Sequence, residues 1–308
     1  MRLWNRRGER SRNERRRQQR GDNSEVVRCS LPPPGPRIFS VATQIIRKAQ
    51  ETGVVKFAVN GVSEQHPCVI PCFWPPSLVF LEVTKLLSVM KEFFSAVPGA
   101  AVGEIGLDKG SHGKKIDFMD QVQVFRQQLK LAKELERPVS VHCVRAFGDL
   151  LEILQSEGPF PAGLILHSYL GSAEMVPGFA KHGAYFSFSG YLTSMKPQKA
   201  KKMLKMVPTD RILLESDAPD GLPQLKGCSL SCVPGDASIP QEQPVHSGTT
   251  NIDSKGTLNH PANISTVLGY VATLLEMPED ELAQVSYRNA MHLFSYPGSK
   301  ISEEAALL

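Results

Sequence analysis

The alternation of short apolar runs with longer helical segments restricts the fold of this chain more than any other feature. From Ile38 onward, runs rich in β-branched residues alternate with segments whose apolar residues recur at helical spacing. The predicted strands are VVKFAV (54–59), VIPCF (69–73), AAVGEI (100–105), PVSVHC (138–143), GLILH (163–167), AYFSFS (184–189) and RILLES (211–216). Near-continuous apolar strands between helices predict a parallel sheet buried on both faces. Size favours a TIM-type (β/α) barrel over an open doubly wound sheet, and no glycine-rich phosphate loop argues for the latter.

The strand count is one short of a closed barrel, which has eight strands. The missing strand should precede the helix at 38–50, where the sequence reads EVVRCSLPPPG. In addition, only ten residues (60–69) separate the cores of two successive strands, and NGVSEQHP in this connection has no helical pattern. The sequence therefore predicts a barrel that is incomplete or distorted at its first one or two βα units.

The charge distribution separates a basic tail from a near-neutral body. Residues 1–28 contain ten Arg and four acidic residues, whereas the whole 308-residue chain has a net charge of only +4. This tail is interpreted either as a nuclear or nucleic-acid-binding patch or as upstream sequence without a role. The predicted organisation is a disordered basic tail and Pro-rich linker (1–36), a barrel (37–296) with a polar loop insertion (220–257), and a C-terminal tail (297–308).

No apolar run of 18 residues and no secretory signal pattern occurs, so we expect an intracellular protein, cytoplasmic or nuclear, without a membrane partner. The sequence leaves the oligomeric state open.

Four ionisable residues stand at the carboxyl ends of predicted strands: Glu104, His142, His167 and Asp217. In a barrel these ends converge on one face, where active sites are built. Oxygen and nitrogen ligands of this kind suit zinc, manganese or magnesium, so the sequence predicts a metal site there. Glu215, on the same strand face as Asp217, is expected to pair with a basic group inside the barrel. Arg145 is predicted to contact a substrate phosphate or to form a surface ion pair.

The motifs around these residues resemble those of the TatD-type metal-dependent deoxyribonucleases, which belong to the amidohydrolase-like TIM-barrel hydrolases. The motifs are AAVGEIGLD (100–108), PVSVHCVRAFGDLLEIL (138–154), LILHSYLGS (164–172), AYFSFSG (184–190), RILLESDAP (211–219), LNHPANI (258–264) and SYRNAMHLF (286–294). The resemblance covers residues 37 to 296.

The resemblance implies a DNA-cleaving phosphodiesterase with a two-metal site. Glu104 would bridge both metals, His142 and His167 would bind the second, and Asp217 would bind the first and orient the attacking water. Glu104 and Asp217 are thus the predicted catalytic residues. The resemblance also implies one or two divalent metal ions (Mg, Mn or Zn) as the cofactor and DNA as the substrate.

The sequence departs from the family pattern at two places. The family's first strand ends in a His-x-His pair that binds the first metal, whereas this chain reads SLPPPG there. The family also has a Gly-x-His-Pro element, whereas this chain reads Cys72-Phe73-Trp74-Pro75-Pro76. Both departures coincide with the places where the strand pattern fails, and they leave one metal with only Glu104 and Asp217.

Several alternatives therefore stay open beside a nucleic-acid hydrolase. One alternative is a catalytically impaired binding or regulatory isoform, and another is a hydrolase of a different ester or amide. A third is a zinc module built on Cys68/Cys72 and Cys228/Cys232. A lysine-rich helix (196–205) is interpreted as a solvated face, or otherwise as a contact to a nucleic-acid backbone.

Overall fold

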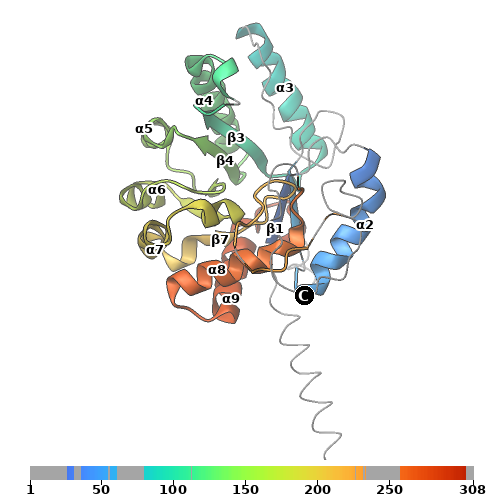
Figure 1. Ribbon diagram of the computed structural model, residues 1–308. Coiled ribbons are helices and arrows are strands. Elements are labelled where there is room, and N and C mark those ends of the chain that lie inside the picture. The colour runs from blue at the N-terminus through green and yellow to red at the C-terminus, as the bar shows by residue number, and fades with distance from the viewer. Residues whose placement is uncertain are drawn as a thin grey trace, which may run out of the picture.

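Parallel strands surrounded by helices form the fold (Figure 1). The computed structural model describes residues 26–30, 36–54, 56–60, 80–111, 113–225, 227–231, 233 and 257–302. The described strands are β1 (Val26–Ser30), β2 (Lys56–Asn60), β3 (Val102–Asp108), β4 (Val139–Val144), β5 (Leu164–Leu166), β6 (Ala184–Phe188) and β7 (Ile212–Leu214). Strands β1 and β2 form one parallel pair, and β3 to β7 form a five-stranded parallel sheet in sequence order. The predicted α/β fold with a buried parallel sheet is confirmed.

The helices occupy the segments in which the apolar residues recur at helical spacing. They are α2 (Pro36–Glu51), α3 (Phe80–Ala96), α4 (Phe118–Glu134), α5 (Phe147–Glu157), α6 (Val176–Lys181), α7 (Pro197–Met206), α8 (Ile264–Leu275) and α9 (Glu279–Leu293). Figure 1 shows them on the outside of the strands. Each of α2 to α7 comes after a different strand in the chain, and α8 and α9 both come after β7. This arrangement covers the outer face of the sheet and directs the strand ends toward one side of the molecule.

Strand β1 corrects the expectation that the first strand is missing. It pairs in parallel with β2 along its whole length, from Val26 opposite Lys56 to Ser30 opposite Asn60. The sequence assigned these residues to the tail and linker, because VVRCS has only two adjacent apolar residues followed by a charged one. Backbone pairing with β2, which hydropathy does not report, makes this segment a strand. The predicted strand at 69–73 and the short connection before it lie outside the described residues.

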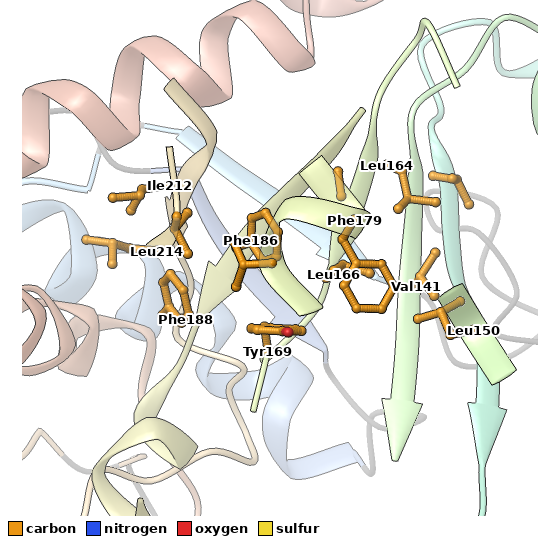
Figure 2. Packing of buried hydrophobic residues seen from close by; sticks show 14 of the residues in the cluster. Val141, Leu150, Leu164, Leu166, Tyr169, Phe179, Phe186, Phe188, Ile212 and Leu214 are labelled. Atoms are coloured by element: carbon orange, nitrogen blue, oxygen red, sulfur yellow. The ribbon is translucent and has the colours of Figure 1, made fainter. Parts of the chain in front are cut away.

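The core lies between the five-stranded sheet and its helices. All five residues of β6 are buried, as are the three residues of β5 and of β7. Figure 2 shows Val141, Leu166 and Phe186 from neighbouring strands packed with Tyr169 and Phe179. The Tyr169 ring meets the rings of Phe186 and Phe179 edge to face, with centroids 5.1 and 6.1 Å apart. Such packing fixes the strand ends, and with them the side chains that follow.

A buried glutamine holds the connection between β3 and α4. The Gln121 side-chain oxygen accepts a hydrogen bond from the Asp108 backbone N–H at 2.9 Å, and its amide nitrogen donates to the Gly113 carbonyl at 3.0 Å. Asp117 caps the helix by accepting from the Met119 backbone N–H at 2.8 Å. The loop that leaves the functional end of β3 is therefore fixed by side chains of the next helix.

Within the described residues, no helix combines the length and the apolar character that crossing a membrane requires.

Candidate metal centre

Four strand ends bring Glu104, His142, His167 and Asp217 together. Glu104 and His142 lie on β3 and β4, His167 follows β5, and Asp217 follows β7. The Glu104 Oε1 atom lies 3.3 Å from His142 Nδ1 and 3.3 Å from His167 Nε2. Asp217 Oδ1 lies 3.4 Å from the same His167 Nε2. The side chains that the sequence predicted at one face are thus neighbours.

The spacing of these atoms fits a divalent metal ion. In a tetrahedral site with ligand bonds of about 2.0–2.1 Å, neighbouring ligand atoms lie roughly 3.3–3.4 Å apart. The distances from Glu104 Oε1 to His142 and to His167 match this edge, and the ligand atoms of this group all lie within 4.8 Å of one another. A second group of this kind is formed by His167, Glu215 and Asp217. The donor set of nitrogen and carboxylate oxygen is the one that zinc and manganese accept.

An irregularity in the sheet directs Glu104 into this group. The register between β3 and β4 shifts between Val102 and Ile105, which places Glu104 inside a bulge. Gly106 then adopts a φ of +155°, and a Cβ at this position would overlap the His142 carbonyl oxygen. Glycine therefore permits the close approach of the two strands that carry Glu104 and His142.

Glu215 orients His167. Its Oε1 atom lies 2.7 Å from His167 Nδ1 and accepts hydrogen bonds from the backbone N–H and the hydroxyl of Ser168 at 2.8 and 2.7 Å. Its Oε2 atom accepts from the Ser187 hydroxyl at 2.7 Å, and the residue is only 1% exposed. A carboxylate on Nδ1 fixes the tautomer in which Nε2 is unprotonated, so that its lone pair is available to a metal ion bound between His167 and the carboxylates of Glu104 and Asp217. The expectation that Glu215 pairs with a basic group inside the barrel is confirmed, with His167 as that group.

Left-handed backbone conformations follow three of the strands. Arg145, Ser168 and Asp217 have φ values of 55°, 43° and 54°, and they come directly or shortly after β4, β5 and β7. A non-glycine residue in this conformation costs on the order of 1–3 kcal/mol and persists where the surroundings enforce it. Three of the five non-glycine residues with positive φ in the described part of the chain thus lie at these strand ends, and the other two are Glu136 and Glu276. Arg145 itself is exposed at the carboxyl end of β4.

Two asparagines of the LNHPANI segment hold the turn that carries Asp217. The Asn259 amide nitrogen donates to the carbonyls of Ser216 and Asp220 at 2.7 and 2.8 Å, and its side-chain oxygen accepts from Asn263 at 2.9 Å. Asn259 is 1% exposed. The sequence showed this segment only as a family motif and gave Asn259 no role. The same holds for Asp108, whose Oδ2 atom lies 3.8 Å from His142 Nε2.

Other predicted features are placed away from this centre or outside the described residues. Lys201 and Lys205 pair with Glu276, and Lys202 pairs with Glu174, which supports the interpretation of this helix as a solvated face. Cys228 is exposed. The other residues of the two cysteine pairs, Cys68, Cys72 and Cys232, lie outside the described residues, as does the tail before Val26.

Comparisons with known proteins show which family this chain belongs to. A model of the family described as TatD related DNase matches residues 40–295. The chain belongs to this family. It is 32% identical, over 72% of its own length and 75% of the relative, to the uncharacterized metal-dependent hydrolase YabD of Bacillus subtilis. It is 27% identical to the deoxyribonuclease Tat-D of Schizosaccharomyces pombe, over 82% and 86% of the two chains.

A solved structure agrees with the TatD fold. The TatD homologue YJJV of Escherichia coli superposes with a TM-score of 0.66 at 23% identity, covering 90% of this chain and 100% of that one. The TatD family match contains Glu104, His142, His167 and Asp217. All four residues of the candidate centre therefore lie in the part of the chain that carries the family likeness.

Proposed function

We propose that this TatD-family chain is a metal-dependent hydrolase that cleaves phosphodiester bonds of DNA. The observation that carries the proposal is the position of Glu104 Oε1, at 3.3 Å from a nitrogen of His142 and from one of His167. Two imidazoles and a carboxylate at metal-ligand spacing, on the carboxyl face of a barrel, are typical of hydrolytic metal sites. The name of the fission yeast relative, a deoxyribonuclease, supports DNA as the substrate.

Each residue of the centre has a distinct role in the proposed reaction. Glu104, His142 and His167 would hold the ion, and Asp217 would complete the set from the other side. A bound divalent ion would supply Lewis acidity toward the phosphate and make water a better nucleophile near neutral pH. Asp217 would accept the proton of the attacking water. Glu215, whose Oε1 atom lies 2.7 Å from His167 Nδ1, would hold His167 in position. Arg145, exposed beside His142, would bind a substrate phosphate.

One resident ion, rather than two, is the stoichiometry that this chain supports. Strand β1 occupies the first place in the fold, and residues 26 to 60 contain no histidine. The imidazole pair that the family uses for its first metal is therefore missing from the first strand and the segment after it, whereas His142 and His167, the ligands of the other metal, are present. The same observation favours a second candidate function, namely a catalytically impaired chain that still binds metal and DNA.

Metal analysis combined with a cleavage assay tests the proposal. The full chain is loaded with Zn²⁺, Mn²⁺ or Mg²⁺, its metal content is measured, and end-labelled single- and double-stranded DNA serve as substrates. Glu104→Gln removes a ligand without changing the size of the side chain, and Glu152→Gln, an exposed position on α5, is the matched control.

Three results separate the candidates. We expect close to one ion per chain, cleavage by the wild type and by Glu152→Gln, and loss of both metal and cleavage in Glu104→Gln. Metal binding without cleavage in the wild type would support the impaired chain instead. Cleavage that survives in Glu104→Gln would show that this site is not the catalytic centre.

A further inference from the structure

We propose that a cavity beside Asp217 binds the nucleobase next to the cleaved phosphodiester, with Tyr191 as the aromatic surface on which the base stacks. The inference rests on the proposed nuclease function and extends it to a base-binding subsite. It is drawn from the shape, the charge and the position of the cavity.

The cavity lies between the loops that follow β6 and β7. Its volume is about 260 Å³, and its walls include Gly190 and Tyr191 from one loop, Pro219, Asp220 and Gly221 from the other, and Leu258. A cavity of roughly 150 Å³ is enough to accept a benzene ring, so a nucleobase fits in size. Because both loops leave the carboxyl ends of their strands, the cavity opens on the same face as the metal centre.

The wall of the cavity is in direct contact with the metal centre. Gly221 has a φ of +65°, and a Cβ at this position would lie 3.0 Å from Asp217 Cβ and 3.6 Å from Asp217 Oδ2. A group seated in the cavity is therefore separated from the Asp217 carboxylate by little more than the Gly221 backbone.

The two loops are held against each other by contacts of their own. A Cβ at Gly190 would overlap the Gly221 carbonyl oxygen, which shows that the backbones touch. The Gln224 backbone N–H donates to the Thr193 hydroxyl at 2.8 Å and joins the loops a second time. A cavity with walls fixed in this way binds a ligand at a low cost in conformational entropy.

The charge around the cavity favours a neutral ring over a phosphate. None of the described residues that line it is a lysine or an arginine, whereas Asp220 is part of the wall and Asp217 lies behind it. A phosphate would be repelled by these carboxylates, but a planar base would not. Tyr191 is 42% exposed and offers its ring as a stacking surface.

The protonation of Tyr191 agrees with this role. Burial raises the pKa of the Tyr191 phenol to about 12, and the charges of Asp217 and Asp220 raise it as well. The phenol therefore stays neutral across the physiological range and adds no further negative charge beside the carboxylates.

A pair of oligonucleotides tests the subsite. One carries a normal base on the nucleotide at the cleaved bond, and the other has an abasic sugar there. Cleavage rates and equilibrium binding by fluorescence anisotropy are measured for the wild type, Tyr191→Phe and Tyr191→Ala. Tyr287→Ala, a tyrosine on α9 that does not line the cavity, is the matched control. Thermal melting shows whether each variant is folded.

In the wild type, we expect the abasic substrate to bind roughly 5- to 150-fold more weakly, the range that corresponds to the stacking of one base. Tyr191→Ala should lose this factor on the normal substrate only, mainly as a higher KM, and Tyr191→Phe should retain most of it. If Tyr191→Ala weakens both substrates equally or neither, the subsite does not exist. Base-dependent binding without cleavage would instead refute the nuclease function and keep the subsite, because the binding measurement does not require turnover.

Discussion

The replacement of Glu215 by glutamine separates the orientation of a metal ligand from the stability of the fold. Glu215 is buried, and its carboxylate contacts His167 Nδ1 at 2.7 Å while accepting three hydrogen bonds from Ser168 and Ser187. Glutamine has nearly the same shape. Its oxygen can take the place of Oε1, and its amide group can donate to the Ser187 hydroxyl, so each of these contacts keeps a partner.

The expected cost in stability is moderate. A hydrogen bond to a charged acceptor contributes about 1.5–3 kcal/mol, against about 0.5–1.5 kcal/mol for a neutral one. Burying an amide is less costly than burying a carboxylate, which offsets part of the difference. We therefore expect Glu215→Gln to lower the free energy of unfolding by roughly 1–3 kcal/mol. Glu215→Ala would instead remove the acceptor from His167 Nδ1, the Ser168 backbone N–H and the Ser187 hydroxyl, at about 1–3 kcal/mol each, which approaches the whole stability of a domain. The Ser168 hydroxyl would keep its 2.7 Å contact with the Ser189 hydroxyl.

Glu215→Gln should weaken metal binding strongly, although glutamine has nearly the same shape as glutamate. Loss of the carboxylate that holds a ligating histidine weakens metal affinity about 10- to 100-fold. Competition against a chromophoric chelator measures this affinity for the wild type, Glu215→Gln and the surface control Glu152→Gln, and urea unfolding measures stability in the same samples. If Glu215→Gln binds metal within about twofold of the wild type, His167 is either not a ligand or not oriented by Glu215, and the argument fails.

Three further predictions concern residues around the centre. Burial, assisted by the charge of Lys48, lowers the pKa of His260 below its usual value of about 6.5, so the folded state excludes the proton. The contribution of His260 to the free energy of unfolding should be constant above that pH and should fall as the pH drops below it. The urea midpoint should therefore decrease less between pH 7.5 and pH 5 in His260→Gln than in the wild type. Gly106→Ala should destabilise the fold by about 1–3 kcal/mol or more, because of the positive φ and the overlap with the His142 carbonyl. Gly148→Ala, where nothing lies within 4 Å of the added Cβ, should be neutral or stabilising in the same urea assay. Burial raises the pKa of the Cys143 thiol to about 12, so iodoacetamide should modify the exposed Cys228 rapidly and Cys143 only after unfolding; equal rates by peptide mass spectrometry would contradict this.

The sequence by itself determined the order of helices and strands in most of the described chain. Burial on both faces of a parallel sheet leaves continuous apolar runs, and a helix that covers the sheet leaves apolar residues at helical spacing, so both signals are local. The same rule placed Glu104, His142, His167 and Asp217 at strand ends. Parallel strands carry their carboxyl ends to one side, so a prediction that they lie together follows from the order of elements alone.

Only the tertiary structure decided the features that depend on partners distant in the sequence. Strand β1 exists because its backbone pairs with β2, although Val26–Ser30 carries too little apolar character to be recognised. The role of Glu215 depends on His167 and Ser187, which arrive from other strands, and the contacts of Asn259 depend on the turn after β7. A hydrogen bond of a buried polar group is set by which neighbour it meets, and no pattern within a single segment records that neighbour.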